Sequence, residues 1–406
     1  MRISFLCACA VLCFGLYAKS PDGISVAFPA QNQRLPFAER TYLIGATDPS
    51  RDAFLYVNGV TTAVYKTGAF ISMVDVVPGT NTVTVFQGRD KIMRRFVVSP
   101  KPPQSEAPGF KPVSGDDDAR LGKICAWKTT GDIFANRVSS LPDGGDTYFF
   151  LPKDFAVSGC EFKGTKKILV WAENKCGFIS RASVELLKDA AIPPKSIIVP
   201  DPALGFPSHP PYDKKSEDVC ICVDAGHGGS DSGALSPHGW KEKDFNLMQA
   251  RAIRDELEKA GFRVIMTRDG DSFPSLLSRP RTAYESKADA FVSVHHNATA
   301  AHRDPREVRH TTTYASLSNG FALASSIQKY VGQVMSPVKD NGAQMKSLAV
   351  CRNPAVPSCL LEVDFINLPE GEAGSMDAKR RNMIAKAVVL GILDWMMDKP
   401  AIAAEE

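Results

Sequence analysis

The sequence predicts a multidomain protein in which two small all-β modules precede a C-terminal α/β domain with a mostly parallel sheet flanked by helices. Three observations support this prediction. The 406 residues are too many for one ordinary domain, so two or three are expected. In the first half of the chain, short alternating apolar runs lie between turn signals, which is typical of strands. From Ser216 onward, predicted strands alternate with predicted helices, as they do in α/β domains.

The composition is that of a soluble globular protein, with 44% hydrophobic and 23% charged residues. The net charge of +3 is small. It is compatible with an anionic polymer surface but gives no argument for a nucleic-acid partner.

Residues 1–19 have the pattern of a secretory signal peptide. Arg2 precedes an apolar run from Ile3 to Tyr17, and the small residue Ala18 follows as the expected cleavage site. An uncleaved anchor is the alternative, but the run is shorter than the roughly 20 residues that cross a bilayer. Lipoprotein maturation at Cys9 also stays open. No later stretch is apolar enough to span, so no stable membrane span is expected after cleavage.

Residues 23–100 are predicted to form a β-sandwich. Their short apolar runs are separated by turn signals such as Asn58-Gly59, which favours a hairpin, and Pro78-Gly79. This arrangement resembles the Ig-like modules that are appended to secreted carbohydrate-active and wall-active enzymes. Such a module would bind the wall or act as a spacer, and a scaffold without a ligand is an equal alternative.

Residues 119–190 are predicted to form a second small β module, between proline-rich linkers at 101–118 and 191–216. The runs Lys167–Ala172 and Cys176–Leu187 indicate a strand, a turn and a final strand. This ending resembles that of bacterial SH3-like domains, which often bind peptidoglycan peptides. An interaction barrel without a wall ligand is the alternative.

Seven of the ten cysteines lie beyond the predicted signal peptide. An odd number cannot all pair within the chain, and no Cys-x-x-Cys pair of the zinc-binding type occurs. Cys220 and Cys222 alternate within one predicted strand, so they face the same side, as small core residues do. Cys160 with Cys176 is the one pair considered for a disulfide.

Residues 217–398 are predicted to form the α/β domain. Strands are expected at 219–223, 263–267, 290–295, around 348–350 and at 360–363. Helices are expected over 244–260, 278–287, 321–334 and 379–396, the first because its apolar residues recur on one face and Gly261 ends it.

Candidate ligands stand where these strands end. His227 lies in the glycine-rich turn Val223–Gly229, where the backbone can come close to whatever the histidine holds. His295 and Glu362 end two other strands, and Glu242 opens the first helix. Each alone is more simply a structural or solvated residue. Together, two histidines and a carboxylate with a fourth position for water are typical of catalytic zinc, and sites form at the carboxyl ends of strands.

Five separated motifs resemble, in order, those of zinc-dependent N-acetylmuramoyl-L-alanine amidases of the Amidase_3 type. The motifs are VDAGHGG at 223–229, GWKEKD at 239–244, MTRD at 266–269, SVHHNA at 293–298 and LLE at 360–362. The resemblance covers about Val219 to Trp395. It implies zinc held by His227, Glu242 and His295, and a sheet of about six strands with the site at one edge.

The resemblance gives Glu362 the role of catalytic carboxylate. Zinc in such a site lowers the pKa of a bound water to about 7 and polarises a carbonyl oxygen. A carboxylate that is not a ligand then takes the proton and returns it to the leaving nitrogen. Asn297 would position the substrate or hold its loop. Arg268 and Arg279 would contact a substrate carboxylate, or form ion pairs that fix loops.

Two positions depart from the family pattern. His296 replaces a usually small residue, and it is expected to point away from the metal because successive strand residues face opposite sides. After Glu362 the family tends to have Gly-Phe-x-Ser-Asn, whereas this chain continues with Asp364 and Phe365. Asp364 is expected to raise the pKa of one of the two neighbouring carboxyl groups.

These features predict an exported amidase that cleaves the bond between N-acetylmuramic acid and L-alanine in peptidoglycan. Its cofactor would be Zn²⁺, its place the periplasm or cell wall, and its role wall remodelling or daughter-cell separation. It would act as a monomer, with activator or divisome proteins as candidate partners. Two alternatives stay open: another zinc hydrolase of the wall, such as a peptidase or deacetylase, and a non-catalytic wall-binding protein.

Overall fold

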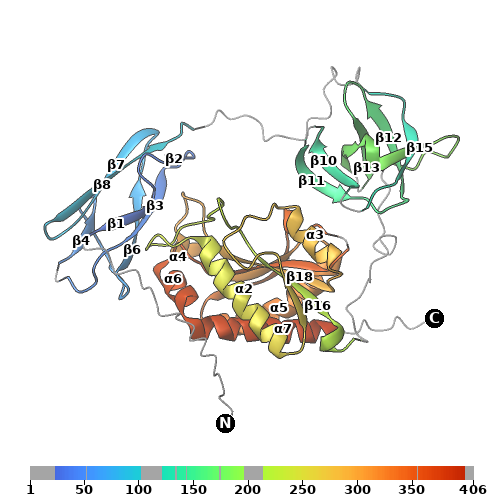
Figure 1. Ribbon diagram of the computed structural model, residues 1–406. Helices are drawn as coiled ribbons and strands as arrows, with labels where there is room; N and C mark the ends of the chain where they lie inside the picture. Colours follow the sequence, from blue (N-terminus) through green and yellow to red (C-terminus); the bar gives the residue numbers. More distant parts are fainter. Residues whose placement is uncertain are drawn as a thin grey trace, which may run out of the picture. The chain divides into compact units, whose positions relative to one another are not determined.

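The computed structural model describes residues 23–51, 53–101, 121–132, 135–142, 144–172, 175–195, 214–353 and 355–397. The predicted signal peptide and most of both predicted linkers lie outside these ranges. Within them the chain forms four β-sheets, of which one belongs to the α/β domain (Figure 1). No helix among the described residues is long and apolar enough to cross a membrane.

The N-terminal part consists of two sheets with strand orders β1-β3-β6 and β2-β8-β7-β4-β5. One core joins them, since Leu43 and Phe70 of the first sheet cluster with Val57, Val85 and Phe96 of the second. The prediction of short strands in two packed layers is therefore confirmed. The strands are β1 (Ser25–Phe28), β2 (Arg34–Leu35), β3 (Arg40–Ala46), β4 (Leu55–Val57), β5 (Val60–Thr62), β6 (Ala69–Asp75), β7 (Gly79–Gln87) and β8 (Asp90–Val98).

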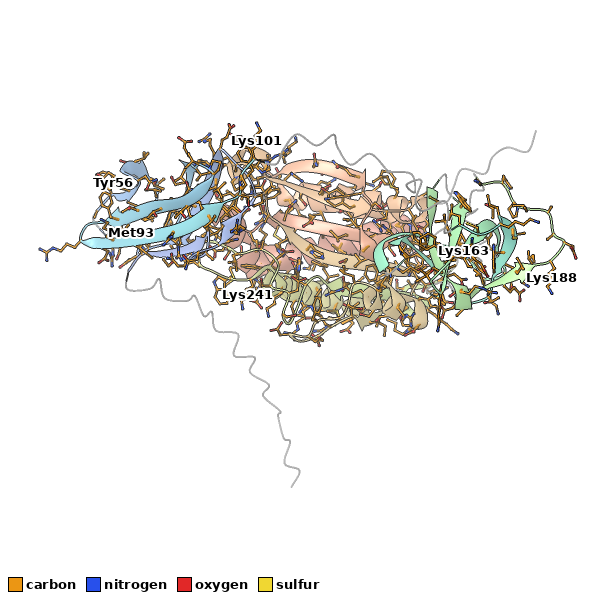
Figure 2. The ribbon with its side chains drawn as sticks, turned by 90° about the horizontal axis from the view of Figure 1, so that it is seen from above. Tyr56, Met93, Lys101, Lys163, Lys188 and Lys241 are labelled. Atoms are coloured by element: carbon orange, nitrogen blue, oxygen red, sulfur yellow. The ribbon has the colours of Figure 1, made fainter. Side chains whose placement is uncertain are left out.

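The predicted hairpin turn joins β4 to β5. Asn58 and Gly59 have φ angles of 48° and 82°, the left-handed values that a two-residue hairpin loop needs. On the outward side of this sheet, the ring of Tyr56 stacks on that of Phe86, and Met93 of β8 is 58% exposed (Figure 2).

The second β-rich part is a seven-stranded antiparallel sheet with the order β11-β10-β14-β13-β12-β9-β15. The predicted final strand 176–187 is two strands, because the 3-10 turn η1 (Arg181–Ser183) interrupts it. β14 then pairs with β13, whereas β15 pairs with β9. The strands are β9 (Cys125–Thr129), β10 (Arg137–Leu141), β11 (Gly144–Phe150), β12 (Ala156–Phe162), β13 (Lys167–Ala172), β14 (Lys175–Ser180) and β15 (Val184–Leu187).

The considered disulfide between Cys160 and Cys176 is wrong, because both are free thiols. Cys160 pairs with Leu169 of β13, and Cys176 pairs with Trp171 on the other side of that strand. The two cysteines are separated by two strand spacings of about 4.8 Å each. This separation is larger than the roughly 7 Å between Cα atoms that a disulfide can span.

The C-terminal part is an α/β domain with one six-stranded sheet in the order β17-β16-β18-β21-β19-β20. All neighbours run parallel except β19 and β21. This confirms the predicted fold class and the strand number. The strands are β16 (Cys220–Ala225), β17 (Arg263–Met266), β18 (Ala290–Asn297), β19 (His310–Ala315), β20 (Lys339–Met345) and β21 (Ser358–Phe365).

Helices cover both faces of this sheet. One core joins residues of α2, α5 and α7 to the strand residues Val223, Val292 and Leu361, and a second core joins α3 and the 3-10 turn η4 to the opposite face. The four predicted helices are present with ends that shift by up to three residues. The helices are α2 (Glu242–Lys259), α3 (Ser278–Glu285), α4 (Pro305–Val308), α5 (Ser318–Met335), α6 (Pro369–Met376) and α7 (Ala378–Met397).

The strand predicted around 348–350 is wrong. Residues Ala349–Cys351 form η4, whose Val350 packs into the second core. The strands β19 and β20 had no prediction, because four of the six residues of β19 are one histidine and three threonines, and the edge strand β20 is largely polar. An edge strand with exposed polar residues lacks the apolar pattern from which a strand is predicted.

The core of the α/β domain gives a first prediction. Leu361 of β21 is completely buried, so Leu361→Ala should lower the free energy of unfolding of this domain by about 2–5 kcal/mol. Hydrogen exchange of the amides of β18 in increasing urea measures this domain alone. Leu390→Ala on α7, whose side chain is 50% exposed, is the matched control and should change the value by less than about 0.5 kcal/mol. Equal effects of both variants would contradict the packing described.

Candidate metal centre

His227 follows the carboxyl end of β16 in a tight turn, with a φ of 58°. Glycine is required at two positions near the histidine, one in this turn and one in the segment that leads to α2. A Cβ atom on Gly226 would lie 2.1 Å from Nε2 of His295, and one on Gly233 would lie 2.6 Å from Oε2 of Glu242. The missing side chains therefore leave the space into which the three candidate ligands converge.

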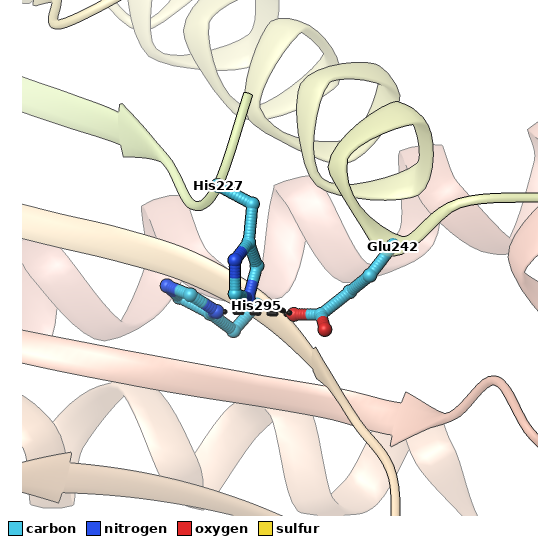
Figure 3. Close-up of side chains that lie close together, drawn as sticks. All are labelled: His227, Glu242 and His295. Atoms are coloured by element: carbon cyan, nitrogen blue, oxygen red, sulfur yellow. Dashed lines mark hydrogen bonds and ion pairs between the residues drawn. The ribbon is translucent and has the colours of Figure 1, made fainter. Parts of the chain in front are cut away.

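Three side chains from three separate elements meet at this point (Figure 3). Oε1 of Glu242, at the start of α2, lies 3.2 Å from Nε2 of His227 and 3.1 Å from Nδ1 of His295. The two imidazole rings are 4.9 Å apart between centroids. One ligand atom from each residue lies within 4.8 Å of the others, so the residues predicted from the sequence as a ligand set are brought together.

The electrostatics of the cluster follow from the buried carboxylate. Burial by itself would raise the pKa of Glu242, but the hydrogen bonds to His227 and His295 outweigh it and hold the pKa well below its usual range. Conversely, burial opposes protonation of His227, and the carboxylates of Glu242 and Asp231 raise the pKa of this imidazole to about 9. A carboxylate that draws protons onto two imidazoles would also attract a cation in their place.

The donor set fits a zinc ion. Zinc takes imidazole nitrogen and carboxylate oxygen at about 2.0–2.2 Å in tetrahedral geometry, which places neighbouring donors roughly 3.4 Å apart. The observed separations of 3.2 Å and 3.1 Å around Oε1 of Glu242 are close to this value. Three protein donors leave a fourth position for water or substrate, as in catalytic sites.

Glu362 lies beside the cluster because of the register of the sheet. His295 of β18 is paired with Glu362 of β21, and paired residues on parallel strands point to the same face. Oε2 of Glu362 is buried and makes no hydrogen bond within the described part of the chain. Burial raises the pKa of Glu362 to about 7, with the neighbouring Glu242 adding to the rise against the opposing effect of His295. Such a group both accepts and releases a proton near neutral pH.

The expectation for Asp364 needs correction. Its carboxylate receives hydrogen bonds of 2.9 and 2.8 Å from Arg309 and one of 2.7 Å from Arg380. Burial would raise the pKa of Asp364, but the two arginines outweigh it and lower the pKa. The raised pKa of Glu362 comes from its burial and from Glu242 instead. A carboxylate neutralised by two guanidinium groups exerts little field on its neighbour.

Two residues that orient the candidate ligands had no sequence prediction. Oδ2 of Asp231 lies 2.8 Å from Nδ1 of His227, which leaves Nε2 free to face Glu242. Asn246, one helical turn after Glu242, donates to Oε1 of Glu242 at 3.2 Å. Metal-binding histidines are commonly oriented by a carboxylate in this way. Asp231 and Asn246 each lie four residues after the candidate ligand that they contact, and this spacing was the sequence signal from which they could have been predicted.

The structure supports the loop-fixing alternative for both arginines. Arg268 donates to the carbonyl oxygens of Ala225, Gly226, Lys243 and Gly270, at 2.8–2.9 Å. Arg279 donates to Asp224 and Ala225, and at 2.7 Å to the carbonyl of His227. Both guanidinium groups are buried and engaged, so they hold the histidine turn rather than face a substrate.

The end of β18 holds the remaining predicted residues. The carbonyl of Asn297 accepts a hydrogen bond from the backbone of Ile366, which ties the strand end to the segment after Glu362. His296 is buried away from the cluster, where its ring packs against Phe245 and burial lowers its pKa to about 4. The predicted opposite orientation of His295 and His296 is confirmed.

The comparisons with known proteins concern this domain. A curated relative, the probable cell wall amidase LytH of Staphylococcus aureus, is 33% identical over 174 residues, which are 42% of this chain and 56% of that protein. The chain thus spans about half the length of the curated relatives it matches.

Among solved structures, the catalytic domain of CwlV, an N-acetylmuramoyl-L-alanine amidase from Bacillus (Paenibacillus) polymyxa var. colistinus, is 31% identical. The match covers 45% of this chain and 99% of that one, with a TM-score of 0.42. The N-acetylmuramoyl-L-alanine amidase AmiC2 of Nostoc punctiforme is also 31% identical, over 44% of this chain and 97% of that one, with a TM-score of 0.41. Residues 221–394 match the family model described as N-acetylmuramoyl-L-alanine amidase, so the C-terminal part of the chain is a domain of the Amidase_3 family.

Proposed function

We propose that the protein is a zinc-dependent hydrolase of peptidoglycan that cleaves the amide between N-acetylmuramic acid and L-alanine. The observation that carries this proposal is the convergence of His227, Glu242 and His295 beside Glu362, whose Oε2 is buried. The family match of residues 221–394 and the printed names of the relatives support the substrate class.

In the proposed mechanism, His227, Glu242 and His295 would hold zinc, which when bound would polarise the scissile carbonyl and lower the pKa of a water. Glu362 accepts a proton from the attacking water, since its raised pKa lets it act as a base near neutral pH. The new C–O bond gives a carboxylate on the lactyl group. Glu362 then returns the proton to the nitrogen as the C–N bond breaks, and the stem peptide leaves with a free L-alanine amine.

The proposed cell-wall substrate also leads to proposals for the localisation, the two β-rich parts and the physiological role. A cell-wall substrate requires action outside the cytoplasm, which agrees with the predicted signal peptide. We propose that the two β-rich parts, as Ig-like and SH3-like modules over 23–100 and 119–190, keep the domain of residues 217–398 on the wall. We assign the physiological role to wall remodelling or daughter-cell separation. Asn297 is proposed to position the substrate or its own loop.

Metal removal tests the proposed reaction. Purified muropeptides incubated with the protein should give a stem peptide that begins at L-alanine, seen by mass spectrometry. The product should disappear with a chelator and return with added zinc, because the ligand set holds the metal reversibly. Cleavage within the peptide, or loss of an acetyl group, would favour a different wall hydrolase. Intact muropeptides under all conditions would favour a wall-binding protein.

Glu362→Gln should separate chemistry from metal binding. The amide cannot accept the proton, so kcat should fall by about 10²–10⁴-fold. The zinc content, measured by atomic absorption, should stay at that of the parent protein because Glu362 is not in the ligand set. Asp364→Asn would be a poor control, since its carboxylate binds two arginines. Glu370→Gln on α6, an exposed carboxylate, is suitable and should leave both values unchanged. Loss of zinc from Glu362→Gln would contradict the assigned role.

His227→Ala, unlike Glu362→Gln, should lose zinc. Removal of one of three ligands should weaken zinc binding by more than about 100-fold, beyond the effect of losing an outer partner of a ligand. Competition with a chromophoric chelator measures the affinity. His302→Ala, at an exposed histidine outside the ligand set, is the control and should bind zinc like the parent. Equal zinc affinity of both variants would remove His227 from the ligand set.

A further inference from the structure

We propose that His296 is a positioning residue for the metal centre: it fixes the amide of Asn246, which in turn holds the carboxylate of Glu242. The inference rests on the proposed metal-binding role of Glu242, but not on the identity of the cleaved bond. It concerns a buried histidine that has no place in the proposed mechanism.

β18 presents its two consecutive histidines to two different surroundings. His295 faces Glu242 at the candidate metal centre, whereas His296 is 2% exposed and lies against α2. The ring of His296 is 5.7 Å from that of Phe245 between centroids, and its Nδ1 is 2.9 Å from Oδ1 of Asn246. One strand therefore supplies a candidate ligand and a contact to the helix that carries another.

The hydrogen bonds of Asn246 determine which group donates and which accepts between His296 and Asn246. Its Nδ2 lies 3.2 Å from the carbonyl oxygen of Gly226 and 3.2 Å from Oε1 of Glu242. These two acceptors use both hydrogens of the amide nitrogen. Oδ1 can only accept, so Nδ1 of His296 must carry a hydrogen and donate it. A flipped amide would turn its oxygen toward a carboxylate and a carbonyl, which is unfavourable.

His296 thereby acts on the metal site through one intermediate. Asn246 is completely buried, so loss of the donor at Oδ1 would leave a buried acceptor unpaired. The amide would then gain by reorienting, and its hydrogen bond to Oε1 of Glu242 would weaken. Oε1 is the atom that faces both His227 and His295. The cost of losing His296 should therefore be measurable as weaker metal binding.

Two substitutions at position 296 separate hydrogen bonding from packing. Asn carries a donor close to the position of Nδ1, whereas Leu fills a similar volume without a donor. Zinc affinity of the metal-depleted full chain is measured by competition with a chromophoric chelator. His296→Leu should weaken zinc binding by about 10-fold, the lower end of the range for outer partners of ligands. His296→Asn should restore affinity close to that of the parent. Equal affinities of His296→Leu and the parent would overturn the proposal.

A control variant addresses general destabilisation. Ile253 lies on α2, is completely buried in the core and makes none of these hydrogen bonds. Ile253→Val should lower the melting temperature of the metal-free protein but leave zinc affinity unchanged. If it weakens zinc binding as much as His296→Leu does, the effect is one of helix packing and the proposal is wrong.

A double-mutant cycle tests whether His296 acts through Asn246. In an Asn246→Ala background, His296→Leu should cause no further loss of zinc affinity, since the intermediate is already absent. A further loss of about 10-fold would contradict this path. A parent protein that binds zinc but leaves muropeptides intact would contradict the proposed reaction alone. A parent that binds no zinc would refute both proposals.

Discussion

The carboxylate of Glu242 is the constraint around which the α/β domain is arranged. A buried carboxylate is costly unless charges and hydrogen bonds compensate it. Here the two imidazoles and the backbone amide of Ala234 surround it, together with the side chain of Asn246. These partners come from the turn after β16, from β18 and from α2 itself. The contacts that compensate this one charge are therefore the contacts that bring the site together. A divalent cation would compensate the charge further.

The turn that carries His227 needs support because its backbone adopts conformations that most residues avoid. Arg268 and Arg279 supply that support by donating to carbonyl oxygens on either side of the histidine. Lys243 adds a bond of 2.8 Å to the carbonyl of Gly229. Backbone strain at a site persists where the surroundings hold it in place. The positive charges of Arg268, Arg279 and Lys243 therefore stabilise the backbone of this turn.

The parallel sheet determines where the polar side chains of the candidate site lie. Because β18 and β21 run in the same direction and in register, His295 and Glu362 lie side by side at the carboxyl ends of their strands. His295 lies at hydrogen-bond distance from Glu242, while Oε2 of Glu362 is buried without a hydrogen-bond partner in the described part of the chain, and the pKa of Glu362 lies near neutrality. The parallel direction of the two strands therefore brings neighbouring polar side chains into different surroundings.

The sequence by itself predicted the fold class and the four main helices, and the resemblance of its five motifs to the Amidase_3 family implied the set of His227, Glu242, His295 and Glu362. The fold class and the helices follow local rules, since apolar periodicity marks helices and buried strands, and glycine-rich turns mark the strand ends. The tertiary structure decided the rest. It paired Asp231 with His227 and Asn246 with Glu242, neutralised Asp364 with Arg309 and Arg380, and separated Cys160 from Cys176 by an intervening strand. The contacts of Asp364 with Arg309 and Arg380 join residues far apart in the chain. Asp231 and Asn246 are each four residues from their partner, but their contacts depend on the rotamers of polar side chains, which the spacing alone does not fix.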